Sequence, residues 1–340
     1  MRMRLLAVGL IAALLVITPF VSPAVRAADT LPNAITDPAF WKMTSDFSEK
    51  GGTFVFEMFM SNEATFQRII PDLLKVAPQG GAYLGVAPEQ NFTYIATLRP
   101  RIAFIIDIRR ENMIEMLMYK ALFEMSANRG EFLSRLFSRR PRSAQSDPQA
   151  SVESLFAALS GGRGDAQLFA QNLQAIKDRL QKTHAFPLTT GDLRTIDYIY
   201  NAFYRGGPDA SLTTYGTSYR LLMRQTDSRG RNWNFLTSEP NFQFVRQMQQ
   251  KNLIVPVVGD FAGPKAIRAV AKYLHDHSAV VSAFYVSNVE EYIGSPASVW
   301  SAYCRNIATL PVNASSTFIR FGRSGRGSFL GAMQPFIKGC

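Results

Sequence analysis

Four nearly uninterrupted apolar runs constrain the fold more than any other feature of this sequence. They cover residues 82–87, 102–108, 253–258 and 279–286. Continuous apolar strands are typical of parallel sheets that helices cover on both faces. Helical stripes separate the runs; one of them spans 114–125, where apolar residues recur three and four positions apart. Strands that alternate with helices predict an α/β fold with a Rossmann-like, mainly parallel sheet.

The long interval between the second and third runs predicts a large helical insertion, residues 129–251. Apolar stripes at helical spacing recur within it, and a polar, basic, proline-broken loop interrupts it at 138–150. In chain order, we expect a mainly helical segment 28–79, the first part of the core 80–128, the insertion, the second part of the core 252–325, and a C-terminal tail 326–340. Residues 317–321 are expected to add a fifth strand, and a helix is expected to begin at Gly263-Pro264 with proline in its first position.

Residues 1–27 have the order of a secretory signal peptide. Arg2 and Arg4 precede an apolar run, and Val25-Arg26-Ala27 provides a cleavage site. The alternative is a retained anchor, but in both cases the basic flank stays inside and the body is exported, to the periplasm or the medium. Cleavage removes three arginines and no acid, so the net charge falls from +11 to +8. No later run is long enough to predict a transmembrane span in the mature chain.

Few other residues suggest familiar chemistry. Cys304 and Cys340 are the two cysteines; in an oxidising compartment they either pair or stay free, and the sequence leaves this open. His275 and His277 do not share a helix face, so no metal site is expected. No G-x-S-x-G or P-loop motif is present.

The strand ends carry the candidate site. In doubly wound sheets, ligands bind beyond the carboxyl ends of the strands. Near the end of the first run, Gly85 lets the backbone approach a ligand. Asp107 stands near the end of the second run, at the spacing of a ribose-binding acid, and Asp260 follows the third. The glycine fingerprint is incomplete, and Glu89 at the start of a helix disfavours a pyrophosphate. A nucleoside-type ligand without pyrophosphate, such as S-adenosylmethionine, tolerates an acid there better.

The run Gly85–Phe92, the turn Asp107–Arg110, Gly259-Asp260-Phe261 and Ser287–Glu290 resemble a bacterial family of uncharacterised proteins. That family looks like a class I S-adenosylmethionine-dependent methyltransferase core. By this resemblance, Gly85 lies under the methionine part of the cofactor, Asp107 holds the ribose and Asp260 faces the adenine. Ser287 and Asn288 then face the reacting group.

Each candidate also has a purely structural interpretation. Asp107 pairs with Arg109 or Arg110, Asp260 caps the helix near Pro264, and Asn288 forms a turn. Three functions therefore stay open: an exported protein that binds a nucleoside-type ligand, a non-catalytic envelope scaffold, and a genuine S-adenosylmethionine-dependent methyltransferase. In the scaffold, an anionic envelope surface rather than nucleic acid is the expected partner of three loop arginines, Arg139, Arg140 and Arg142.

Overall fold

A computed structural model describes residues 29–340 except 87, 143–146, 162, 215 and 323–326. The expected signal peptide, residues 1–27, lies outside the described residues, as does the centre of the basic loop. Among the described residues, no helix is both long enough and apolar enough to cross a membrane.

A six-stranded sheet forms the centre of the molecule and confirms the Rossmann-like α/β prediction. Its order is β3-β2-β1-β4-β5-β6, and all strands are parallel except β6, which runs antiparallel to β5. In this order β1 lies beside β4, and the strands that follow each of them are added on opposite sides of the sheet. Ligands usually bind at such a switch point, beyond the carboxyl ends of the strands. The strands are β1 (Ala82–Gly85), β2 (Ile102–Asp107), β3 (Ile254–Val258), β4 (Val281–Ser287), β5 (Thr317–Gly322) and β6 (Gly327–Ala332).

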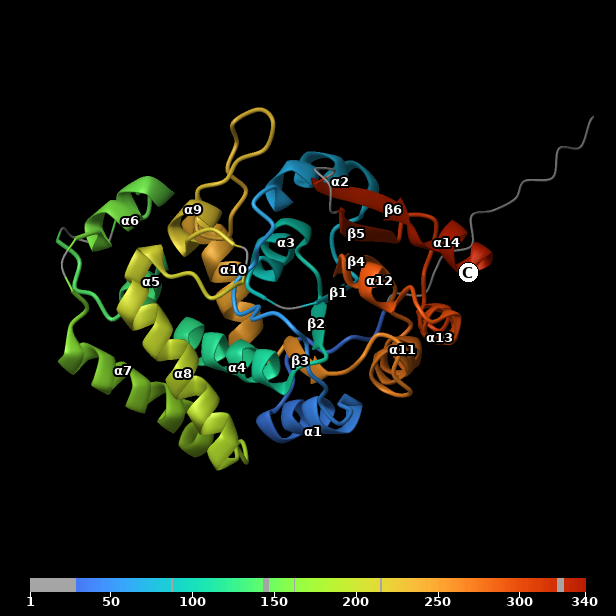
Figure 1. The fold of residues 1–340 in the computed structure, drawn as a ribbon, viewed down its shortest axis with the longest axis horizontal. Helices are drawn as coiled ribbons and strands as arrows, with labels where there is room; N and C mark the ends of the chain where they lie inside the picture. The colour runs from blue at the N-terminus through green and yellow to red at the C-terminus, as the bar shows by residue number, and fades with distance from the viewer. Residues whose placement is uncertain (1–28, 87, 143–146, 162, 215, 323–326) are drawn as a thin grey trace, which may run out of the picture.

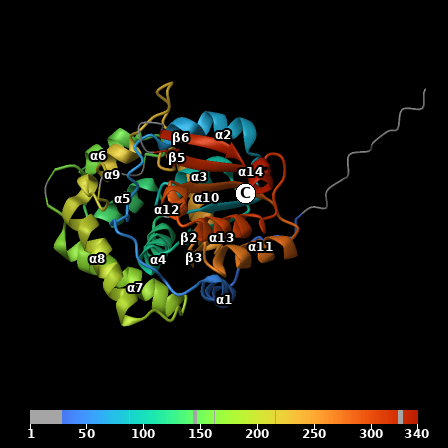
Figure 2. The same cartoon turned by 45° about the vertical axis from the view of Figure 1, so that its right-hand side comes forward.

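Helices cover both faces of the sheet, so its apolar strands are buried as expected (Figures 1 and 2). One face carries α3 (Asn91–Leu98), α4 (Arg110–Met125) and α10 (Glu239–Gln250), and the other carries α11 (Ala266–Asp276), α13 (Ala297–Ile307) and α14 (Met333–Gly339). Around them lie α1 (Asp37–Phe47) beside β3 and α11, α2 (Ile70–Val76) beside α3, and α12 (Val289–Ile293) after β4. Arg99 follows α3 as its C-cap in the left-handed conformation, and the next residue, Pro100, cannot continue the helix.

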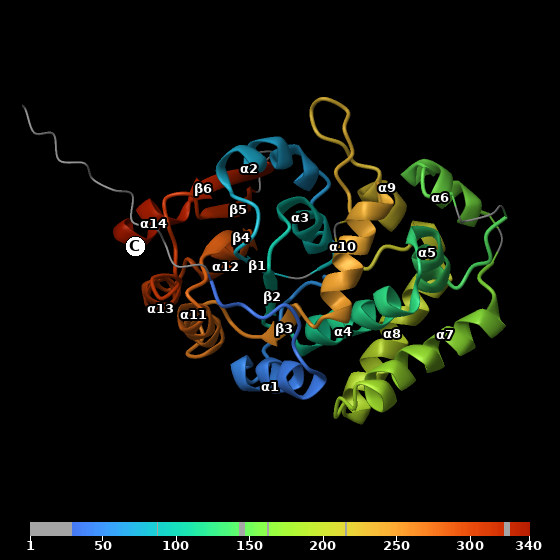
Figure 3. The ribbon, with the colours of Figure 1, turned by 180° about the vertical axis from the view of Figure 1, so that it is seen from behind.

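The connection between β2 and β3 is the predicted helical insertion (Figure 3). Between α4 and α10 it contains α5 (Arg129–Phe137), α6 (Val152–Leu159), α7 (Ala166–Asp178), α8 (Thr190–Gly206) and α9 (Tyr219–Met223). A capping box at Thr189 and Asp192 starts α8. Aromatic rings join the insertion to α4: Phe123 stacks on Phe132 with 4.6 Å between ring centroids.

A buried group of charges ties α1 to the insertion. His184, which follows α7, lies between the carboxylates of Asp37 and Glu124, at 2.9 Å and 2.7 Å. Lys120 pairs with Glu124 at 2.7 Å. We call this group the His184 clasp.

Two expectations for the second half of the core are wrong. Residues 326–340 do not form a tail, because β6 completes the sheet edge and α14 packs beside it, with a disulfide between Cys340 and Cys304 of α13. The helix near Pro264 begins at Ala266 rather than at the proline. Its cap comes from far away in sequence: the carboxylate of Glu49 accepts hydrogen bonds from the N–H groups of Lys265 (2.8 Å) and Ala266 (2.7 Å).

Candidate functional site

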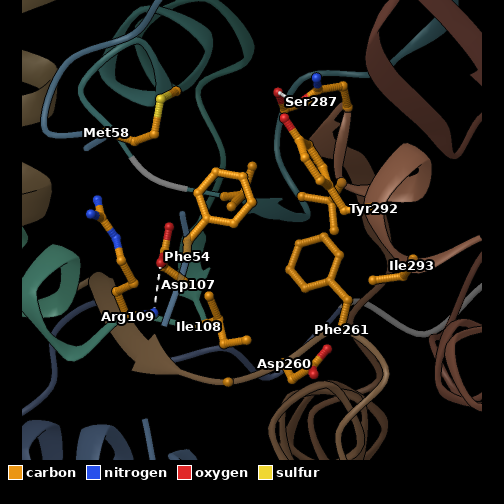
Figure 4. A pocket seen from close by; sticks show the side chains of 14 residues that line it. Phe54, Met58, Asp107, Ile108, Arg109, Asp260, Phe261, Ser287, Tyr292 and Ile293 are labelled. Atoms are coloured by element: carbon orange, nitrogen blue, oxygen red, sulfur yellow. Dashed lines mark hydrogen bonds between the residues drawn. The ribbon is translucent and has the colours of Figure 1, made fainter. Parts of the chain in front are cut away.

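A pocket of about 170 Å³ opens at the carboxyl ends of four neighbouring strands (Figure 4). Its walls come from the segments that follow β1, β2, β3 and β4, and from an extended segment at 54–58. Four of the sequence-predicted residues line it together: Asp107, Asp260, Ser287 and Asn288. A cavity of about 150 Å³ holds a benzene-sized ring, so this pocket has room for at least one ring of a ligand.

The two acidic residues stand at the ends of adjacent strands. Asp107 Oδ1 accepts a hydrogen bond from the Arg109 N–H at 2.8 Å, which leaves Oδ2 as an acceptor for a ligand. Burial raises the pKa of Asp107 to about 6, against the opposing effect of the Arg109 N–H and guanidinium. Asp260 Oδ1 accepts from the Ala262 N–H at 2.8 Å. Asp260 does not cap the helix that follows it, as its structural interpretation proposed, because Glu49 accepts the hydrogen bonds at the start of that helix.

Arg110 does not pair with Asp107. Its guanidinium makes a bidentate pair with Asp192 of α8, at 2.7 Å and 2.8 Å. The Asp107 carboxylate is thus held by the backbone of its own turn and by the charge of Arg109, and it has no guanidinium hydrogen bond among the described residues. This arrangement keeps a carboxylate at the pocket without neutralising it.

Ser287, the last residue of β4, is in the left-handed region with φ of 52°. A non-glycine residue in that region stores strain of about 1–3 kcal/mol and is held by its surroundings. Here the hydroxyl of Ser287 donates to Oε1 of Glu63, which also accepts from the Tyr285 hydroxyl at 2.6 Å. Burial raises the pKa of Glu63 to about 7. Asn288 lines the pocket and precedes α12 without capping it through its side chain.

Aromatic rings form much of the remaining wall, and the sequence did not predict them as site residues. Phe54 lies across the middle of the pocket, with its ring 4.9 Å from that of Tyr292 in an edge-to-face contact. Phe261, from the turn after β3, lines the same space. The sequence feature that could have indicated these rings is Gly51-Gly52, which stands before an aromatic run. In the structure the N–H of Gly52 donates to the carbonyl of Ile108 at 2.8 Å, and this contact brings Phe54 over the strand ends.

Gly85 and Glu89 are not among the described residues that line the pocket. A Cβ added at Gly85 would lie 1.9 Å from Oδ1 of Asn91, so the chain's own amide fills the space beside this glycine. That amide is fixed by a hydrogen bond from the Tyr83 hydroxyl and by its own donation to the carbonyls of Val86 and Pro88. The close approach at Gly85 is thus made by a side chain.

Glu89 is buried in the protein interior and does not line the strand-end pocket. It is inaccessible to solvent, and both of its carboxylate oxygens accept from the N–H of Ser61, at 3.4 Å and 3.2 Å. Burial raises its pKa to about 8. A buried, largely protonated carboxyl is not the dipole-stabilising anion that its place near a helix start suggests.

The arginines of the basic loop make contacts within the protein. Arg140 pairs with Asp165 at 2.7 Å, Arg139 packs against Gly207, and Arg142 packs against Gly161. The histidines singled out in the sequence also have structural partners: His275 bonds to the carbonyl of Thr309, and His277 to that of Tyr273. Within the described ranges, no group of three His, Cys, Asp or Glu side chains is arranged to hold a metal ion.

Comparison with known proteins gives a family but no activity. A search among curated proteins found no match to this chain. Residues 58–330 match one protein family, whose description is "Domain of unknown function (DUF7790)". The match begins within the aromatic segment of the pocket and ends inside β6, so it includes most of the strand-end site. The chain therefore belongs to the DUF7790 family.

Proposed function

We propose that this protein is an exported relative of class I S-adenosylmethionine-dependent methyltransferase cores, which binds a nucleoside-type ligand at the strand ends. One observation carries the proposal: Asp107, Asp260, Ser287 and Asn288, from the ends of three strands, line a single pocket with aromatic walls. Carboxylates accept hydrogen bonds from ribose hydroxyls or a base amino group, and aromatic faces stack on a base.

The occupied space beside Gly85 supports a compact ligand. Asn91 fills the place where a cofactor tail would pass close to β1, so the room lies over β2, β3 and β4. A nucleoside needs no space beside Gly85, whereas the methionine part of S-adenosylmethionine does in the methyltransferase arrangement. The proposal therefore favours binding of the nucleoside moiety over methyl transfer.

The disulfide supports export. Cys304 and Cys340 are bonded, with their Cα atoms 5.5 Å apart, and such bonds persist in oxidising compartments. Sequencing the N-terminus of the mature protein tests this part of the proposal. A mature chain that begins near residue 28 is expected, and a chain with Met1 retained in the cytoplasm would contradict it.

Calorimetric titration tests the ligand. We expect adenosine to bind the disulfide-bonded protein more tightly than S-adenosylhomocysteine, whose amino-acid tail needs the space that Asn91 fills. Asp107→Asn should weaken adenosine binding about 10- to 100-fold, since a hydrogen bond to a charged group contributes about 1.5–3 kcal/mol. Asp72→Asn, on the exposed surface of α2, is the matched control and should bind normally. No binding of either nucleoside, or equal affinity in the two variants, refutes the proposal. Methyl transfer from S-adenosylmethionine to any acceptor would favour the methyltransferase alternative.

A further inference from the structure

A second group of polar side chains is buried on the other side of the pocket wall. Asn112, Glu115 and Tyr119 are three and four residues apart on α4, so they share one face of that helix. Tyr219 of α9 packs on the same ring, Phe203, as Tyr119 does. Besides burial, the carboxyls of Glu89 and Glu115 raise the pKa of both tyrosine hydroxyls, so Glu89 also belongs to this group. All five side chains are inaccessible to solvent. We call these five residues the inner cluster.

The inner cluster contains buried polar atoms without partners. Both carboxylate oxygens of Glu115, Oδ1 of Asn112 and the hydroxyls of Tyr119 and Tyr219 have no hydrogen-bond partner among the described residues. A buried polar group left unpaired costs about 1–3 kcal/mol, and folded proteins pair nearly all of them. So many unpaired atoms in one place indicate that the cluster is completed by something other than this chain.

The cluster lies next to the strand-end pocket. Nδ2 of Asn112 donates to the carbonyl of Met58 at 2.8 Å, and Met58 lines the pocket. Arg109 also lines the pocket, and its charge acts on Glu115. Met58 and Arg109 thus separate the two sites. On the far side, Tyr119 and Tyr219 both pack on Phe203 of α8, so helices of the insertion close the cluster.

The charges around Glu115 favour a cation. Three other carboxyl groups act on it, those of Glu89, Asp107 and Glu57, against the guanidinium of Arg109. The unpaired oxygens of Glu115 and Asn112 are acceptors for N–H donors. The described residues offer no metal-binding group of three His, Cys, Asp or Glu side chains, so an organic cation fits better than a metal ion.

We propose that the inner cluster is a second binding site, which takes the protonated amino or guanidinium group of a small organic cation. Glu115 forms the ion pair, Asn112 accepts a further N–H, and the two tyrosine hydroxyls complete the shell. Burial and neighbouring carboxyls hold the pKa of Glu115 well above its ordinary value, which favours the protonated carboxyl in the absence of the cation. Entry of the cation ionises Glu115, and the released proton goes to the buffer. Binding is therefore tighter at higher pH.

Calorimetry with putrescine, agmatine and arginine tests this site in the full disulfide-bonded chain. At least one of these probes is expected to bind at millimolar concentration or below, more tightly at pH 8 than at pH 6, and with an enthalpy that depends on the buffer because a proton is released. Glu115→Gln should weaken that binding about tenfold or more. Glu111→Gln, on the exposed face of the same helix, should leave it unchanged.

A second variant separates binding from folding. Tyr219→Phe removes a hydroxyl that has no hydrogen-bond partner among the described residues, so the melting temperature without probe should not fall, while probe affinity drops severalfold. Failure of all three probes to bind overturns the proposal. So do equal affinities in Glu115→Gln and Glu111→Gln, or a crystal structure grown with the best probe in which waters alone occupy the cluster. Because Asp107→Asn tests the strand-end pocket with nucleosides, failure at one site does not imply failure at the other.

Discussion

Replacing Glu63 by glutamine should change how the stability of this protein depends on pH. Oε1 of Glu63 accepts hydrogen bonds from Tyr285 and Ser287, while Oε2 is buried without a partner among the described residues. Glutamine keeps an oxygen for the two hydroxyl donors and cannot ionise. It therefore imitates the protonated form of Glu63 at every pH.

The magnitude follows from the pKa of Glu63. Burial raises it from the ordinary value of 4.5 to about 7, and each unit is equivalent to about 1.36 kcal/mol. Between these two values the unfolded chain releases this proton while the folded protein keeps it, so the free energy of unfolding falls as pH rises. The loss from this residue amounts to at most about 3 kcal/mol and is complete above pH 7. Glu63→Gln is therefore expected to match the parent near pH 4 and to exceed its stability by up to that amount at pH 8.

Urea unfolding at pH 4.5, 6 and 8, with the disulfide intact, measures the difference between the two proteins. Glu89, whose pKa is also raised, contributes with the same sign to both proteins and cancels. Glu111→Gln removes an exposed carboxyl of the same charge and serves as the control. A difference between Glu63→Gln and the parent that stays constant with pH, or that favours the parent at pH 8, refutes the reasoning.

Three further predictions concern stability and binding. In the His184 clasp, the partners raise the pKa of His184 and lower those of Asp37 and Glu124. The clasp therefore contributes fully to the free energy of unfolding between pH 4.5 and 6.5, where all three groups are charged in the folded protein. His184→Gln should lower the melting temperature most in that window and less at pH 9. Reduction of the disulfide, which closes a loop with a sequence separation of 36, should lower the free energy of unfolding by about 3–4 kcal/mol in urea titrations, and an unchanged midpoint would contradict this. Phe54→Ala should weaken adenosine binding about three- to tenfold through lost ring contact, whereas Val55→Ala, whose side chain is 83% exposed, should leave calorimetric affinity unchanged.

The core of the fold was predictable because its signals are local. The apolar run 102–108 could be buried on both faces only in a covered parallel sheet, and β2 lies there. The stripe at 114–125 lies within α4. Asp107 and Asp260 were found for the same reason: the ends of parallel strands meet at one edge of a sheet.

The rest depends on contacts between distant residues, which local patterns do not record. Strand β6 has the sequence GSFLGA and is half exposed at the sheet edge, so it shows neither an apolar run nor a clear alternation. The cap of α11 comes from Glu49, more than 200 residues earlier in the chain. Phe54 reaches the pocket through an extended segment without periodicity. Glu115 stands in a helix buried on nearly every side, and its place in the sequence gave no hint of its neighbours.

The fit between Gly85 and Asn91 has a consequence for how this family can vary. No side chain fits at position 85 while the Asn91 amide occupies the space, and any smaller residue at 91 would empty it and free the carbonyls of Val86 and Pro88. The two positions are therefore under a joint constraint: position 85 takes no side chain as long as an asparagine stands at position 91. A relative that opens this space to a cofactor has to replace the asparagine first. Substitution at position 91, rather than the number of glycines in the turn, should distinguish members with an accessible β1 turn from those in which the protein has closed it.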